Sequence, residues 1–70
     1  MLKEYLKQYR VKNNLSQKQM AKLLETNQGY YSQIETGYYK PGFKFIRKLS
    51  KVLNVEESFI RSLLWNIQIS

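Results

Sequence analysis

Uncharged hydrogen-bonding side chains gather in one short stretch of this chain, between residues 27 and 36. Gln28 and Gln33 each carry a carboxamide that both donates and accepts hydrogen bonds, and Tyr30 lies between them. A carboxamide can pair through two hydrogen bonds with the N6/N7 edge of adenine, which gives about 1–3 kcal/mol of discrimination. Lysines flank the stretch and can meet phosphates as point charges. These residue types therefore offer the chemistry needed to contact base edges and phosphates.

The charge of the whole chain fits such partners. Twelve Lys and Arg residues against five Asp and Glu residues give 70 residues a net charge of +7. An excess of this kind favours polyanions, nucleic acid first and an anionic membrane surface second. The alternative is a basic protein that is merely soluble, and charge alone does not decide between the two.

The residues on which most enzymes depend are missing. The chain has no histidine and no cysteine, which removes the usual general base at neutral pH, the commonest metal ligand, thiolate sites and disulfides. Glu56 and Glu57 do not form a catalytic pair, because neighbours on a helix point about 100° apart. We therefore expect no enzymatic activity, no metal site and no cofactor.

Membrane insertion and secretion are not expected either. The longest apolar run, at residues 63–65, is far shorter than the roughly 20 residues of a membrane span. Residues 1–5 lack the apolar stretch of a signal peptide. The expected location is the cytoplasm, and a chain of this length has room for one small core.

Apolar periodicity predicts five short helices that share this core. The first covers residues 2–13, because its apolar residues recur at i, i+3, i+4 and i+7: Leu2, Tyr5, Leu6 and Tyr9. Asn13 and Asn14 can end it, since asparagine tolerates the left-handed conformation at a helix C-terminus. Ser16 and Gln19 have the spacing of a capping box, which predicts the start of a second helix.

A tight turn at Glu25-Thr26 separates the second helix from the third. Asn27 is placed to cap the third helix, and Gly37 to end it with a positive φ angle. The inward-facing residues of the two helices are Met20, Ala21, Leu24, Tyr31 and Ile34.

The fourth and fifth helices are predicted over residues 43–53 and near residues 56–65, with Asn54 ending the fourth. Their apolar residues are Phe45, Ile46, Leu49, Val52, Leu53, Phe59, Ile60, Leu63 and Leu64. We expect one domain over residues 1–65 and a short tail over residues 66–70.

Residues from about 6 to 60 resemble the phage repressor/Cro-like helix-turn-helix family, often called XRE-type or Cro/C1-type regulators. The matching residues are Arg10, Leu15-Ser16-Gln17, Met20-Ala21, Leu24, Ser32-Gln33-Ile34-Glu35, Gly37, Pro41, Leu49, Leu53 and Val55. Their joint spacing is far more specific than any single element. The resemblance implies an all-α fold, a compact five-helix lambda-repressor-like DNA-binding domain.

The resemblance also implies that the third helix enters the major groove of double-stranded DNA. Base contacts are expected from Gln28, Gly29, Tyr30 and Gln33. Phosphate contacts are expected from Gln17, Lys18, Tyr39, Lys40 and Lys44. Gln17 could also brace Gln28. The alternative for the lysines and glutamines is a solvated surface position, and for Tyr30 it is a ring that covers a hydrophobic edge.

Arg10 and Glu35 are expected to serve the structure instead, because the family pattern pairs them in a mostly buried ion pair. The chain departs from the family at Glu25, where glycine is usual. Either Glu25 adopts a positive φ angle at a cost of about 1 kcal/mol or the turn closes differently. Tyr31 replaces a smaller residue, which would displace the recognition helix slightly. Gly29 weakens that helix by roughly 1 kcal/mol relative to alanine, which close approach to DNA would offset.

The leading functional hypothesis is a sequence-specific transcriptional regulator, a repressor that binds a pseudo-palindromic operator as a homodimer. The dimer contact is expected from the fifth helix and the tail, through Phe59, Leu63, Trp65 and Ile67. The alternatives are a DNA-binding antitoxin, a restriction-control protein, and a protein–protein interaction module that keeps the fold without binding DNA.

Overall fold

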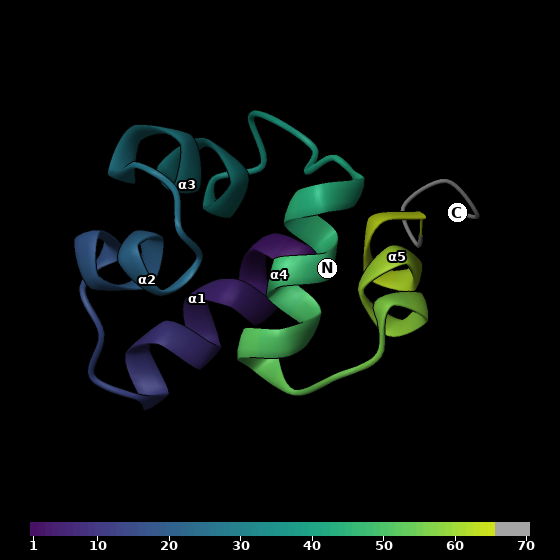
Figure 1. Ribbon diagram of the computed structural model, residues 1–70, viewed down its shortest axis with the longest axis horizontal. Helices are drawn as coiled ribbons and strands as arrows, with labels where there is room; N and C mark the ends of the chain where they lie inside the picture. The colour runs from purple at the N-terminus through teal and green to yellow at the C-terminus, as the bar shows by residue number, and fades with distance from the viewer. Residues whose placement is uncertain (66–70) are drawn as a thin grey trace.

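Five α-helices make up the described part of the chain, residues 1–65 of a computed structural model (Figure 1). They are α1 (Leu2–Lys12), α2 (Gln17–Leu23), α3 (Gln28–Glu35), α4 (Phe43–Leu53) and α5 (Glu57–Trp65). The all-α, five-helix prediction is confirmed, and the predicted bounds of α1, α4 and α5 hold to within one residue. The predicted tail at residues 66–70, with Ile67, lies outside the described residues, as does the side chain of Trp65.

Side-chain caps begin α2 and α3 at the predicted positions. Ser16 Oγ accepts a hydrogen bond from the Gln19 N–H at 3.0 Å, and Gln19 Oε1 accepts one from the Ser16 N–H at 2.8 Å, which completes the capping box. Asn27 Oδ1 accepts from the Tyr30 N–H at 2.7 Å. These local hydrogen bonds fix the residue at which each of the two helices begins.

Residues with positive φ angles end four helices: Asn14 (56°), Glu25 (57°), Gly37 (84°) and Asn54 (57°). After α3, the Gly37 N–H donates to the Ile34 carbonyl at 3.1 Å and the Tyr38 N–H to the Gln33 carbonyl at 2.8 Å, which is a Schellman motif. The same two backbone hydrogen bonds follow α1, from Asn14 and Leu15, and α2, from Glu25 and Thr26. Of the two alternatives for the turn before α3, the structure therefore contains the one in which Glu25 is left-handed.

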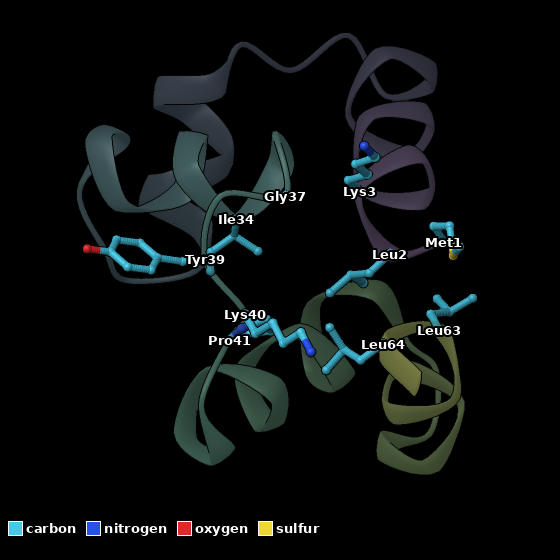
Figure 2. A pocket seen from close by; sticks show the side chains of 10 residues that line it. All are labelled: Met1, Leu2, Lys3, Ile34, Gly37, Tyr39, Lys40, Pro41, Leu63 and Leu64. Atoms are coloured by element: carbon cyan, nitrogen blue, oxygen red, sulfur yellow. The ribbon is translucent and has the colours of Figure 1, made fainter. Parts of the chain in front are cut away.

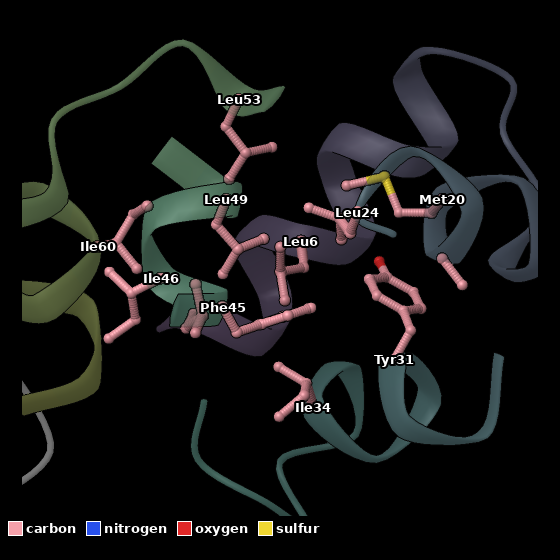
Figure 3. Packing of buried hydrophobic residues seen from close by; sticks show 12 residues of the cluster. Leu6, Met20, Leu24, Tyr31, Ile34, Phe45, Ile46, Leu49, Leu53 and Ile60 are labelled. Carbon is pink, nitrogen blue, oxygen red and sulfur yellow. The ribbon is translucent and has the colours of Figure 1, made fainter. Parts of the chain in front are cut away.

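One apolar core lies between the helices (Figure 3). Its buried members are Leu2, Leu6, Met20, Ala21, Leu24, Tyr31, Ile34, Phe45, Ile46, Leu49, Leu53 and Ile60. Tyr31 is the largest of the fully buried side chains, and Figure 3 shows its ring directed from α3 toward Met20 of α2 and Leu24, which directly follows α2. A tyrosine thus occupies the space between the two helices, where the resemblance implied a smaller residue.

The predicted apolar stripe of α5 is wrong at one position. Phe59 is 41% exposed and contacts Tyr5 of α1 edge-to-face, with ring centroids 5.4 Å apart. Successive residues of a helix point about 100° apart, so the burial of Ile60 turns Phe59 toward the margin of the core. Leu63, Leu64 and the α4 residue Val52 are half-buried beside the core.

Helix α1 connects the two halves of the domain. It contacts α3 on one side and α5 on the other, while α2 packs on α3 and α4 packs on α5. The Tyr9 hydroxyl of α1 also donates to the Val52 carbonyl of α4 at 3.2 Å. Figure 1 shows that α3 lies at the margin of this arrangement, above α2 in the view. None of the helices within residues 1–65 is long and apolar enough to cross a bilayer.

Candidate nucleic-acid interface

Helices α2 and α3 are joined by a four-residue connection, Leu24 to Asn27. The inner side of α3 is buried and consists of Tyr31, Ile34 and Glu35. Because side chains rotate by about 100° per residue along a helix, this burial turns Gly29 and Gln33 to the opposite side. The buried side of α3 therefore packs against the rest of the domain, and the opposite side faces outward.

Of the four residues expected to contact bases, Gly29 and Gln33 belong to this outward side, and Gln28 is the first residue of α3, at its N-terminal end. Gln28 and Gly29 are exposed, and Gln33 is half-buried. A Cβ atom at Gly29 would meet Asn27 Oδ1 at 3.4 Å, an ordinary contact. The fold itself therefore does not require glycine at position 29. Because Gly29 has no side chain, another molecule can approach the α3 backbone closely at this point.

Tyr30 is placed differently from the other three residues. Its ring is half-buried and meets Phe45 of α4 edge-to-face, with centroids 5.2 Å apart and planes at 90°. The ring thus covers a hydrophobic edge, which was the alternative to base contact. If Tyr30 contacts DNA, it does so through the outer edge of its ring and its hydroxyl group.

Exposed residues from the segments next to α3 form what we call its cationic rim. Lys18 at the start of α2, Tyr39 and Lys40 in the connection after α3, and Lys44 in the first turn of α4 are all exposed. They come from α2, from the connection after α3 and from α4. Lys44 lines a hollow together with Tyr30 of α3, and Lys40 lines a pocket together with Ile34. Positive charges on both sides of a helix are suited to the two phosphate strands that border a groove.

Gln17, also expected at a phosphate, has its side chain directed into the protein. Its Nε2 donates to Glu35 Oε1 at 3.1 Å, and this hydrogen bond replaces the predicted bracing of Gln28. A buried carboxylate is a stronger acceptor than a carboxamide, which accounts for the difference.

The carboxylate of Glu35 is the centre of a hydrogen-bond network. Arg10 binds it through two hydrogen bonds, from Nε to Oε2 at 2.8 Å and from Nη2 to Oε1 at 3.0 Å. The Tyr31 hydroxyl donates to Oε2 at 2.5 Å, and Gln17 Nε2 also donates to Oε1. Glu35 is only 7% exposed, and Arg10 Nη1 also donates to the Leu15 carbonyl at 3.0 Å. The expected ion pair between α1 and the end of α3 is thus present and has two further partners.

The network fixes the charge of its members. Burial raises the pKa of Glu35, but hydrogen bonds from Arg10, Tyr31 and Gln17 outweigh it and leave that pKa below its usual value. The hydrogen bond to Glu35 raises the pKa of Arg10 against the opposing effect of burial. Burial, and then the hydrogen bond to Glu35, raise the pKa of Tyr31. At neutral pH the carboxylate is ionised and the phenol is protonated.

Sequence reasoning did not include Tyr31 and Gln17 in this network. A signal existed for Tyr31, because residues four apart on a helix are neighbours and Glu35 is four positions further along. Gln17 offered no such signal, since 18 residues separate it from Glu35.

An apolar pocket of about 130 Å³ lies behind the connection that carries Tyr39 and Lys40 (Figure 2). Its lining is Met1, Leu2, Lys3, Ile34, Gly37, Tyr39, Lys40, Pro41, Leu63 and Leu64. The polar groups of this lining come from Lys3, Tyr39 and Lys40. Within residues 1–65 the structure holds no group of three or more potential acidic, histidine or cysteine metal ligands.

Two short helices joined by a tight turn, of which the second carries accessible amide side chains, have the arrangement of a helix-turn-helix domain. The sequence profile of the helix-turn-helix family HTH_3 matches residues 6–60. The chain therefore belongs to this family and is a DNA-binding transcription regulator of the XRE (Cro/C1-like) type. Neither a curated protein nor a solved structure matches it.

Proposed function

We propose that the protein represses transcription by binding a pseudo-palindromic operator as a homodimer, with α3 in the major groove. The observation that carries this proposal is that Gly29 and Gln33 lie on the outward side of α3 while Gln28 is exposed at its N-terminal end. The opposite side of the same helix is anchored by Tyr31 and Glu35. A rigidly held helix with free carboxamides is suited to hydrogen-bond base edges, in particular adenine.

The phosphate contacts in this proposal come from Lys18, Tyr39, Lys40 and Lys44. Gln17 can join them, because its Nε2 has a second hydrogen beyond the one bound by Glu35. Tyr30 would contribute through its hydroxyl group. Such contacts position the domain on the duplex, whereas the amides select the sequence.

A homodimer would bring two recognition helices to half-sites about 34–36 Å apart on one side of the duplex. We propose α5 as the dimer contact, since Phe59 is exposed and Leu63 half-buried on its surface. Trp65 and Ile67 belong to the same proposal, although the side chain of the first and the whole of the second lie outside the described residues. Repression would follow from steric block of the promoter.

We further propose that the protein acts by binding, without catalysis, and in the cytoplasm, where a bacterial or phage operator would be found. A DNA-binding antitoxin or a restriction-control protein would use the same α3 surface. A protein–protein interaction module would not need amides at Gln28 and Gln33 bordered by lysines, so the structure favours a DNA-binding role.

Selection of bound sites from random duplexes tests the proposal. We expect an inverted repeat with half-site centres about one helical turn apart and adenines opposite the glutamines. Gln28→Ala or Gln33→Ala should each relax the preference at one position. Gln8→Ala, at an exposed glutamine of α1, is the matched control and should select the wild-type site. Unchanged operator preference in the double variant Gln28→Ala/Gln33→Ala would contradict the base-reading assignment.

A further inference from the structure

Phe43 is the most exposed large apolar side chain in the part of the chain that the structure describes, at 79%. It is the first residue of α4. Phe45, two positions further along, is 7% exposed and belongs to the core. Residues two apart on a helix point in nearly opposite directions, so the ring of Phe43 points away from the core. The fold gives no reason for an aromatic residue at this position.

The surroundings of Phe43 join it to the outward side of α3. A surface hollow next to the ring is lined by Tyr30 of α3, by Lys44 and Lys48 of α4, and by Glu25 of the turn before α3. Lys48 also pairs with Glu25 at 3.5 Å. Phe43 thus lies on a continuous surface with the flank of the recognition helix, and lysine charge borders it.

We propose that Phe43 is a DNA contact: its ring packs on deoxyribose and base edges next to the bases that α3 reaches, while Lys44 binds the adjoining phosphate. This inference rests on the proposed function and adds an apolar contact to it. A duplex strand offers anionic phosphates and apolar sugar faces within a few ångströms of each other. The carboxylate of the same hollow, Glu25, is paired with Lys48. An apolar protein partner would therefore cover the ring but would desolvate Lys44 without supplying it a counter-charge, which costs free energy.

The positive charge of Lys44 next to the ring therefore favours a DNA duplex over an apolar protein as the partner of this surface. The contact has a distinctive signature, because an apolar contact releases no condensed counterions and leaves the salt dependence of binding unchanged. Loss of a lysine contact lowers the slope of log K against log salt by about one unit instead. Salt titration consequently separates the two residues although they are adjacent in sequence.

The test measures binding of the full chain to the selected operator duplex and to a random-sequence duplex by fluorescence anisotropy across a salt series. Phe43→Ala should raise Kd by about tenfold on the operator, equivalent to about 1.4 kcal/mol, with the wild-type salt slope. Phe43→Leu and Phe43→Trp, which keep an apolar side chain, should recover most of the affinity. Val11→Ala removes an exposed apolar side chain from α1 and should bind like the wild type.

Hydroxyl-radical footprinting on the operator locates the contact. Phe43→Ala should lose protection of the sugars beside each half-site while protection inside the half-sites is kept. Thermal unfolding should give the same midpoint for Phe43→Ala and the wild type, since the ring is mostly exposed. If Phe43→Ala binds and protects DNA like the wild type, the inference is wrong and the proposed function stands. If the wild-type protein binds no duplex, the proposed function itself fails.

Discussion

The hydroxyl group of Tyr31 donates a hydrogen bond to Glu35 Oε2 at 2.5 Å, and both residues lie on the buried side of α3. Arg10 of α1 and Gln17 of α2 bind the same carboxylate. One carboxylate therefore fixes the orientation of α3 against two other helices. Rotation of α3 about its axis would break these hydrogen bonds, so the direction of Gln33 is tied to the buried network.

Replacement of Tyr31 by phenylalanine should reduce the acid sensitivity of the fold. The pKa of Glu35 is lowered in the native state, so its ionised form contributes stability above the unfolded pKa of about 4.3 that is lost as pH falls through the native pKa. Tyr31→Phe removes one of the hydrogen bonds that lower this pKa. We expect a smaller loss of unfolding free energy on acidification than in the wild type, measured by urea unfolding at a series of pH values.

The same variant should also change the alkaline side of the profile. Burial raises the pKa of Tyr31, so the neutral phenol contributes stability that is fully present below the unfolded pKa of about 10 and is lost as pH rises above it. Phenylalanine does not titrate, and the difference between the two proteins should shrink as pH rises through this range. Parallel pH profiles for the two proteins would contradict the role given to Tyr31.

The Arg10–Glu35 pair should behave as a coupled, largely buried unit. Arg10→Met and Glu35→Leu should each lower the unfolding free energy by about 3–5 kcal/mol, because each leaves the other charge unpaired. The double variant should cost much less than the sum of the two. Arg61→Met, which removes an exposed ion pair with Glu57 at 3.4 Å, is the control and should cost about 0–1 kcal/mol. Single variants that melt like the wild type would refute the pairing.

The helix boundaries were predictable because the interactions that set them are local. The capping residues Ser16 and Asn27 bond to backbone atoms three positions away, and Gly37 and Asn54 have the left-handed conformation that their residue types favour. Each of these interactions depends on a few adjacent residues. A sequence displays such information directly.

The positions of Tyr30 and Gln17 were not predictable in the same way. Tyr30 of α3 contacts Phe45 of α4, and Gln17 of α2 contacts Glu35 of α3, in both cases between different helices and beyond the reach of local spacing. Their side chains could equally have faced solvent or DNA by local spacing alone. The contacts exist only because the tertiary fold brings α4 beside α3 and α2 beside the end of α3.

The lysines of the rim should contribute affinity without selectivity. Lys40→Ala and Lys44→Ala should each weaken binding to operator and random duplexes by a similar factor and lower the slope of log K against log salt by about one unit. Lys7→Ala, at an exposed position on α1, should leave the slope unchanged. If the slope of log K against log salt is the same for all three variants, Lys40 and Lys44 do not contact phosphates.

The left-handed conformation at position 25 should favour glycine over other residues. Its φ angle of 57° costs a residue with a side chain roughly 1 kcal/mol that glycine does not pay. Because any substitution also removes the exposed pair with Lys48, the comparison that isolates the backbone is Glu25→Gly against Glu25→Ala. We expect the glycine variant to be more stable than the alanine variant by about 1 kcal/mol in urea unfolding. Equal stability would mean that the turn relaxes to another conformation.

Substitution of Gly29 should change the stability of the fold and the affinity for DNA in opposite directions. A Cβ atom there meets only an ordinary contact with Asn27, and alanine is the better helix former by about 0.8–1.0 kcal/mol. Gly29→Ala should therefore raise the unfolding free energy. If the α3 backbone approaches the duplex closely, the added methyl group should at the same time weaken operator binding, measured by anisotropy beside the unfolding curves. A variant that is more stable and binds DNA as well as the wild type would show that Gly29 does not lie against the bases.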